Sequence, residues 1–250
     1  MTENSALTHF TIIIPAWNEA ACIEQTLSAI NTACKEVHSD LQFDGEVVVV
    51  DNNSTDQTAE IARANGANVV FEPVNQIAKA RNTGARSARG QWLLFVDADT
   101  IISSDLLAAA LSRLAGGEAV AGGATIAFDQ KLTGCAAGLV RLWNWWSVRS
   151  RTAAGCFIFC NKDAFDAVGG FDERQFVAEE VYLSKGLRKF AKANGQAFSI
   201  ISDYPVLSSA RKKDWYSTGR IAWQILLLLI PGASRSRRLC GVWYDRSHLG

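Results

Sequence analysis

The chain has 250 residues, which suits one large α/β domain or two small ones, and 48% of them are hydrophobic, enough to bury a sizeable core. Lys and Arg together number 25, as do Asp and Glu, so the formal net charge is zero. A nucleic-acid-binding protein usually carries a basic excess, so this balance argues against a nucleic-acid partner. The first ten residues lack the basic and apolar stretches of a signal peptide, which predicts a cytoplasmic protein.

The first part of the chain alternates short apolar runs with segments of helical periodicity. Strands are predicted at residues 10–15, 46–51, 68–71 and 92–97, and helices follow them at residues 19–37, 55–65, 76–88 and 104–114. Ser103 or Ser104 is expected to cap the fourth helix. Because these strands are continuously apolar, we expect helices on both of their faces, as in a Rossmann-like, doubly wound and mainly parallel α/β sheet.

After about residue 118 the alternation becomes less regular. Strands are predicted at residues 119–128, 155–160, 197–201 and 206–209, and helices at residues 132–148 and 177–192. No repeat or low-complexity linker separates the two parts, so the sequence predicts one continuous domain.

Polar residues follow three of the predicted strands at their carboxyl ends. These are residues 15–19, 51–54 and 97–99. In open parallel sheets the ligand binds beyond the carboxyl ends of the strands, so we expect all three groups at one ligand-binding edge.

The two carboxylates Asp97 and Asp99 flank Ala98 at one of these strand ends. Carboxylates this close repel each other unless a cation lies beside them. Mg²⁺ and Mn²⁺ prefer oxygen ligands and bridge to phosphates, so the pair predicts a cation that neutralises a departing diphosphate. The alternative is a strand-end loop in which one Asp caps the next helix.

Other charged residues also have two interpretations. Asp51 ends a strand, where a carboxylate can bind a ribose or a base, whereas Asp56 is expected to cap the following helix. Lys79 can face a diphosphate or belong to a solvated helix face. Glu179 and Glu180 open the last helix, where one can act as a general base or both can be ordinary partners of the helix dipole.

Taken in order, these segments resemble glycosyltransferase family 2, the inverting enzymes of the GT-A fold. The matching stretches are IIIPAWNEA at 12–20, VVVVDNNSTDQT at 47–58, AKARNTGARSARGQWLLFVDADT at 78–100, GCFIFCNKDAFDAVGGFDE at 155–173 and EEVYLSKGLRK at 179–189. They cover most of residues 10–211, and five such stretches in the family's order make a specific match.

The resemblance implies a metal-dependent transferase that moves a sugar from a UDP- or GDP-sugar to a hydroxyl of a saccharide or lipid-linked acceptor. It implies Mg²⁺ or Mn²⁺ as the cofactor. Within a single GT-A domain at 1–250, it implies a nucleotide-sugar-binding half at 8–117, an acceptor half at 118–211 and a basic, aromatic C-terminal helix and tail at 212–250.

The resemblance also implies roles for single residues. Asp99 would bind the metal, Asp97 the ribose or donor sugar, and Asp51 the base. Gly155 and Cys156 would line the acceptor side by their backbone. The other expected nucleotide-sugar contacts are Pro15, Ala16, Asn18, Glu19, Asn53, Lys79, Arg81, Asn82, Ala98 and Arg211, of which Arg211 can instead belong to a surface charge run.

The expected general base departs from the family pattern. The family usually has a Glu-Asp pair in which the Asp is the base, and this chain has Glu179 and Glu180. Glu180 occupies the place of the Asp and is the expected base, with its carboxylate displaced by about one C–C bond. Glu179 is the alternative base. The departure also supports an alternative function, a catalytically silent nucleotide-sugar-binding module.

The longest apolar run, residues 221–230, is much shorter than the roughly 20 residues that span a bilayer. The basic residues that follow it are Arg235, Arg237 and Arg238. This pattern predicts a helix on a membrane surface, and so a peripheral position at the cytoplasmic membrane face. Packing on the core or in a dimer is the alternative. Trp143, Trp145 and Trp146 would extend this apolar surface or stack on sugar rings.

Overall fold

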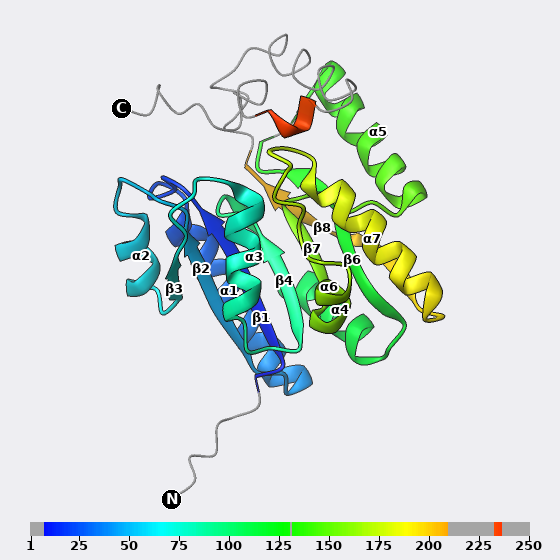
Figure 1. Cartoon of the computed structure of the whole chain (residues 1–250), viewed down its shortest axis with the longest axis horizontal. Helices are drawn as coiled ribbons and strands as arrows, with labels where there is room; N and C mark the ends of the chain where they lie inside the picture. The colour runs from blue at the N-terminus through cyan, green and yellow to red at the C-terminus, as the bar shows by residue number, and fades with distance from the viewer. Residues whose placement is uncertain (1–7, 131, 210–232, 237–250) are drawn as a thin grey trace, which may run out of the picture.

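The computed structural model describes residues 8–130, 132–209 and 233–236. Their strands form one 8-stranded sheet in the order β3-β2-β1-β4-β7-β6-β8-β5 (Figure 1). Some of the residues with an expected role lie outside the described residues: Arg211, the apolar run at 221–230, Arg237 and Arg238. The nucleotide-sugar contact of Arg211 and the helix on a membrane surface therefore stay predictions.

The first half of the chain builds the parallel part of the sheet. Its strands are β1 (Phe10–Ala16), β2 (Gly45–Asp51), β3 (Asn68–Phe71) and β4 (Trp92–Val96), and neighbouring strands pair in parallel. Its helices are α1 (Ile23–Leu41), α2 (Thr58–Ala64), α3 (Ile77–Ser87) and α4 (Ser104–Ala115). The predicted elements of this half are therefore confirmed apart from their ends. Ser103 caps α4, because its hydroxyl accepts the N–H of Leu106 at 3.1 Å.

Successive residues of the apolar strands pack on opposite faces of the sheet. Ile12 and Ile14 of β1 belong to one buried cluster, with α1 and α4, whereas Ile13 belongs to a second cluster, with α3 and α7 (Glu179–Ala193). Alternate side chains of a strand point to opposite faces, so a continuously apolar strand requires a cover on both. This confirms the doubly wound, mainly parallel α/β sheet.

The second half is more irregular than the sequence predicts. Its elements are β6 (Ala119–Phe128), α5 (Gly134–Ser150), β7 (Phe157–Asn161), α6 (Lys162–Ala167), α7, β8 (Ala197–Ser208) and the short 3₁₀ helix η1 (Ala233–Arg235). The short strand β5 (Thr100–Ile101) precedes α4 in the chain but pairs with β8 of this half. β7 runs antiparallel to β4 and β6, and β5 runs antiparallel to β8.

Two parts of the prediction need correction. The strands expected at 197–201 and 206–209 are one strand, β8, which is paired with β6 across an irregular register. β5 and α6 were not expected, because two and six residues carry too little periodicity to be recognised.

In the part of the chain that the structure describes, no helix combines the length and the apolar character needed to cross a membrane.

Candidate functional site

The predicted site residues lie at the carboxyl edge of the parallel strands. Ala16 at the end of β1 pairs with Asp51 at the end of β2, and the N–H of Asn52 donates to the Ala16 carbonyl at 2.8 Å. β4 lies on the other side of β1 and leads directly into Asp97. The expectation that the three strand-end segments share one edge is confirmed.

The loops after β1 and β2 are tied to each other. Asn18 donates its backbone N–H to the Ser54 hydroxyl at 3.0 Å, and its side-chain oxygen accepts the N–H of Thr55 at 2.8 Å. The N–H of Glu19 donates to the Thr58 hydroxyl at 2.8 Å. Asn18 takes a left-handed backbone conformation, with φ of 52°, which Asn tolerates better than most residues. Together these bonds make the two loops one continuous wall of the site.

Carboxylates shape the second of these loops. Asp51 accepts the N–H of Ser54 at 3.0 Å and is half-buried, and Asn53 beside it is exposed with φ of 65°. The N-cap of α2 is Gln57, so Asp56 does not occupy the expected capping position. Its carboxylate nevertheless accepts the N–H of Thr58 at 3.0 Å, which fixes the start of the helix.

Asn52 is a buried residue of the site edge that the sequence did not single out. Its amide donates to the carbonyls of Glu72 and Val74 at 3.1 and 2.6 Å, and its oxygen accepts the N–H of Gln76 at 2.9 Å. These bonds hold the connection from β3 to α3 against the end of β2. The only sequence signal is a polar residue directly after an apolar strand.

The turn formed by Asp97, Ala98 and Asp99 is anchored through its backbone. The Ala98 carbonyl accepts the hydroxyl of Thr26, a buried residue of α1, at 2.8 Å. The Asp99 carbonyl accepts the N–H of Ser209 at 3.2 Å, directly after β8. Thr26 was not predicted as a site residue, because a threonine among the apolar positions of a helix gives no distinct signal.

Arg81 of α3 joins three distant parts of the chain. Its Nη1 lies 2.6 Å from Glu179 Oε1, and its Nη2 lies 2.8 Å from Asp97 Oδ1 and 2.7 Å from the Gly155 carbonyl. The arginine side chain is only 1% exposed, and its guanidinium carbon lies 5.2 Å from the centre of the Phe171 ring. We call Arg81, Asp97, Glu179 and Gly155 the arginine cluster.

These charges change one another's pKa values. Burial by itself lowers the pKa of Arg81, but the carboxylates of Asp97, Glu179 and Glu180 outweigh burial and hold that pKa above its ordinary value. Burial also raises the pKa of Glu179, although the charge of Arg81 opposes this rise. Burial, followed by the neighbouring charge of Glu179, raises the pKa of Glu180 to about 8. Arg81 therefore stays charged, and the carboxyl group of Glu180 is protonated below about pH 8.

Glu180 lies at the edge of the arginine cluster. A Cβ placed on Gly155 would lie 3.6 Å from the Glu180 carboxyl carbon and 3.5 Å from Arg81 Nη2. Glu180 is half-buried, whereas Glu179 is buried and bonded to Arg81. Of the two glutamates, Glu180 is thus the one that keeps some exposure to solvent.

Arg81 and Asn82, which are expected to border the diphosphate, are both buried in the structure, and that role stays a prediction. Asn82 is buried, donates to the Phe171 carbonyl and accepts the Phe171 N–H, both at 3.0 Å. Arg81 lies three residues after Ala78 and four before Ala85, both buried, so it faces the interior.

Lys79 is half-buried on the same helix. The pKa of Glu72 is held below its ordinary value, because hydrogen bonds from Thr83 and Val74 and the charges of Lys79 and Arg86 together outweigh the opposing effect of burial. Lys79 is thus close enough to Glu72 to act on it electrostatically.

Asp99 is the remaining carboxylate expected to bind a cation. Within residues 8–130, 132–209 and 233–236, no three or more His, Cys, Asp or Glu side chains are grouped so that they could hold a metal ion. Mg²⁺ and Mn²⁺ do not need such a group, because they are often bound through one or two carboxylates together with substrate phosphates and water. The residues present therefore fit an ion shared between Asp99 and a bound diphosphate.

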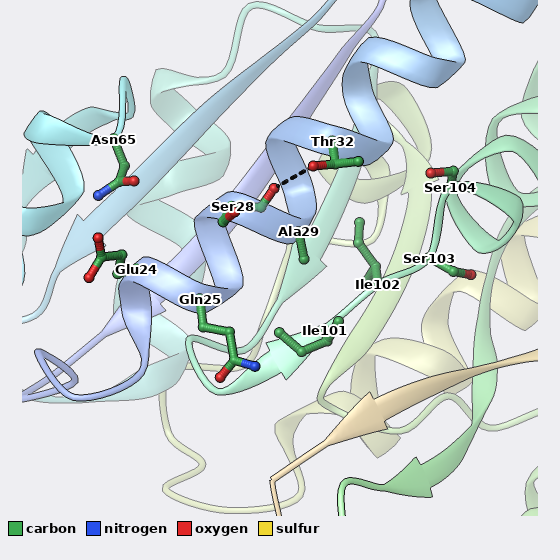
Figure 2. Close-up of a pocket in the computed structure, with 10 residues that line it drawn as sticks. All are labelled: Glu24, Gln25, Ser28, Ala29, Thr32, Asn65, Ile101, Ile102, Ser103 and Ser104. Atoms are coloured by element: carbon green, nitrogen blue, oxygen red, sulfur yellow. Dashed lines mark hydrogen bonds between the residues drawn. The ribbon is translucent and has the colours of Figure 1, made fainter.

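A hollow of about 760 Å³ lies elsewhere, between α1, β5 and the start of α4 (Figure 2). Figure 2 shows Ser28 and Thr32 of α1 facing it from one side and Ile101 and Ser104 from the other. None of the predicted site residues lines this hollow. The chemistry of the side chains, rather than the size of a cavity, locates the candidate site at the strand edge.

Known proteins are similar to this chain in sequence and in fold. The family model described as "Glycosyl transferase family 2" matches residues 11–169. Glycosyltransferase AglE of Haloferax volcanii is 28% identical over 212 residues, which are 80% of this chain and 68% of the relative.

Solved structures share the fold. The mannosyltransferase PcManGT from Pyrobaculum calidifontis, in complex with GDP-Man and Mn²⁺, has a TM-score of 0.64 and 24% identity, over 87% of this chain and 60% of that one. S. aureus TarS in complex with UDP-GlcNAc has a TM-score of 0.63 and 20% identity, over 94% of this chain and 71% of that one. This chain thus spans less than two thirds of the mannosyltransferase.

Proposed function

Because the chain belongs to glycosyltransferase family 2, we propose that it transfers a sugar from a nucleotide-sugar to an acceptor hydroxyl, with inversion at the anomeric carbon. One observation carries the proposal. Arg81 forms ion pairs with Asp97 and Glu179, and Glu180 lies next to them, at the edge where the parallel strands end. A charged cluster of this kind, which changes the pKa of a carboxyl group that an acceptor can reach, is typical of an active site.

The donor would lie along the wall formed by the loops after β1 and β2. Asp51 would bind the base, and Lys79 would approach the diphosphate. The remaining donor contacts we propose are Pro15, Ala16, Asn18, Glu19, Asn53, Asp97, Ala98 and Arg211. Bound GDP-Man and UDP-GlcNAc in the similar structures support a GDP- or UDP-sugar as the donor.

Glu180 is the general base of this proposal. Its carboxylate takes the proton of the acceptor hydroxyl as that oxygen bonds to the anomeric carbon. The bond from this carbon to the diphosphate oxygen breaks at the same time, and its electron pair leaves with the diphosphate. Glu179 is less suited to the role, because its carboxylate is buried and held by Arg81 at 2.6 Å.

Arg81 positions the reacting groups without touching them. It holds Glu179 at the first turn of α7, and the next residue is Glu180. It also holds Asp97 at the end of β4 and the carbonyl of Gly155, beside which the Glu180 carboxyl lies. Asn82 adds to this by holding the loop that contains Phe171.

A divalent cation is part of the proposal. Mg²⁺ or Mn²⁺ bound between Asp99 and the diphosphate would supply the positive charge that stabilises the leaving group. The Mn²⁺ in the similar mannosyltransferase structure supports this cofactor.

The acceptor half proposed at residues 118–211 would receive a saccharide or a lipid-linked hydroxyl. The cytoplasmic location expected from the sequence stays a prediction, and so does the single domain over 1–250.

The test is nucleotide-dependent stabilisation followed by turnover. UDP or GDP is expected to raise the Tm of the wild-type protein more in the presence of Mn²⁺ than in EDTA, because a ligand that binds only the folded state stabilises it. Transfer from the matching nucleotide-sugar is then measured over a panel of acceptors.

Asp99→Ala is the decisive variant, and Asp105→Ala, at an exposed position of α4, is its matched control. Asp99→Ala is expected to lose the Mn²⁺-dependent part of the stabilisation and the turnover, and Asp105→Ala to keep both. Full turnover in Asp99→Ala would disprove the metal role. Nucleotide binding without turnover of any acceptor would instead favour the silent binding module.

A further inference from the structure

The outward face of α5 carries apolar side chains in an exposed position. Its large hydrophobic residues are Leu139, Leu142, Trp145, Trp146 and Val148, and Trp145 is 64% exposed. At 3.6 residues per turn, these five residues fall within one half of the helix circumference. A helix on the surface of a protein ordinarily turns its polar side toward solvent, whereas α5 turns an apolar side toward solvent.

Hydrogen bonds and packing hold the inner face of α5 against the protein, so the helix cannot rotate to bury these residues. Asn144 makes two hydrogen bonds to the backbone of Ile126 in β6, each 2.9 Å long. The buried hydroxyl of Ser147 donates to the Thr152 carbonyl at 2.7 Å, and Trp143 packs against the core. The apolar face is therefore a fixed feature of the fold.

Positive charge accompanies the apolar residues. Arg141 and Arg149 are exposed and fall within the same half of the circumference as Trp145, and Arg151 follows at the C-cap. Residues 134–150 contain no Asp or Glu. A hollow of about 350 Å³ opens beside Trp145, Val148 and Arg149, and it offers room for a headgroup next to a guanidinium.

We propose that this face of α5 docks on an anionic phospholipid surface. An interfacial helix inserts its apolar and aromatic side chains at the boundary between headgroups and acyl chains, while its basic side chains bind the lipid phosphates. α5 lies at the margin of the molecule, beside β6 and β8, where a flat surface can approach it (Figure 1).

A second copy of the chain fits this face less well. In a two-fold symmetric contact, each residue of the face meets the same face of the other copy. Arg141 and Arg149 would then meet like charges, with no carboxylate on either helix to neutralise them. Anionic lipids supply the missing negative charge.

The experiment is vesicle flotation with the full chain. Vesicles of phosphatidylcholine mixed with an equal part of phosphatidylglycerol are compared with vesicles of phosphatidylcholine alone. The wild-type protein is expected to float with the anionic vesicles and not with the neutral ones. This binding requires no turnover, so it can fail or succeed independently of the proposed glycosyl transfer.

Two variants divide the apolar from the electrostatic contribution. The double variant Leu142→Ser and Trp145→Ser is expected to lower the vesicle partition coefficient at least about tenfold, because two large apolar side chains no longer leave water when the face binds lipid. The double variant Arg141→Glu and Arg149→Glu is expected to remove the preference for anionic vesicles. Phe71→Ser is the matched control, since Phe71 is an exposed apolar residue of β3 in the other half of the sheet.

Three outcomes would overturn the proposal. The first is a wild-type protein that does not float with anionic vesicles, and the second is binding that the α5 variants leave unchanged. The third is a dimer, seen by light scattering, that Trp145→Ser converts to a monomer, which would assign the face to a second copy. A Tm unchanged from wild type shows that each variant is folded.

Discussion

The arginine cluster and the outer face of α5 depart from the usual distribution of side chains in opposite ways. Around Arg81 the interior contains charge, with a side chain only 1% exposed between two carboxylates. On α5 the surface carries large apolar side chains of tryptophan and leucine, and Trp145 is 64% exposed. In most proteins charges lie outside and large apolar groups inside.

The comparison shows what makes each departure stable. Charge is tolerated inside because the guanidinium has three oxygen partners, at 2.6 to 2.8 Å. The apolar face stays outside because Asn144 and Ser147 fix the opposite side of α5. Each arrangement departs from the usual distribution of side chains, which supports the ligand proposed for it. A buried charged cluster beside a reachable carboxyl group suits chemistry, and an exposed apolar and basic face suits a surface.

The largest effect is expected at the edge of the arginine cluster. Glu180→Gln removes the group that accepts the proton, and should lower kcat by about 10²- to 10⁴-fold while leaving nucleotide binding unchanged. Steady-state kinetics and calorimetry with UDP and GDP measure the two quantities. Glu60→Gln, at an exposed position of α2, is the control, and Glu180→Asp should retain part of the rate. A wild-type kcat in Glu180→Gln would reassign the base, with Glu179 as the next candidate.

The second effect concerns folding. Arg81→Met leaves the buried Glu179 and the half-buried Asp97 without their cation, and should lower the free energy of unfolding by about 3–5 kcal/mol. Urea denaturation measures this value. The same change at exposed Arg86 of α3 should cost less than about 0.5 kcal/mol. Equal values for the two variants would show that the cluster does not stabilise the fold.

Arg81→Lys separates positioning from stability. It keeps the charge but loses the planar fork that reaches two carboxylates at once. A positioning role predicts a lower kcat with an unchanged KM for the donor. A purely structural role predicts that kcat keeps its wild-type value wherever the variant is folded.

A smaller effect is expected from pH. Burial and the charge of Glu179 raise the pKa of Glu180 to about 8, so below that pH the carboxyl group is protonated and cannot accept a proton. The value of kcat/KM, which reports on the free enzyme, should therefore rise with pH by about tenfold per unit up to about pH 8 and then level off. A kcat/KM that does not change between about pH 6 and 8, where this group is expected to titrate, would show that the protonation of Glu180 does not control the rate.

The smallest effect is expected on α5. Trp145→Ser removes an exposed side chain and should change the free energy of unfolding by no more than about 0.5 kcal/mol. Urea denaturation in the absence of lipid tests this directly. A loss as large as that expected for Arg81→Met would mean that Trp145 packs against the protein, and the contrast between the two regions would disappear.

The sequence by itself determined the parallel half of the fold and brought the candidate site residues to one edge of the sheet. Continuously apolar runs such as residues 46–51 require a cover on both faces, and the polar residues after them must then meet at one edge. The apolar periodicity of α1 and α4 and the cap at Ser103 are equally local signals, because they depend on residues within a few positions of one another. The family resemblance added Glu180 and Asp99 on the same local basis.

Only the tertiary structure decided what these residues contact. The resemblance implies that Arg81 contacts the nucleotide-sugar, but it does not give the structural partners of Arg81. These are Gly155, just before β7, and Glu179 of α7, far along the chain. Thr26 and Asn52 became part of the site through bonds to Ala98 and Gln76 that no spacing predicts. The pKa of Glu180 likewise follows from burial and from its neighbours. The physical reason is that periodicity reports which side of an element faces the core, whereas the partners of a buried charge depend on how the strands are ordered and paired across the whole sheet.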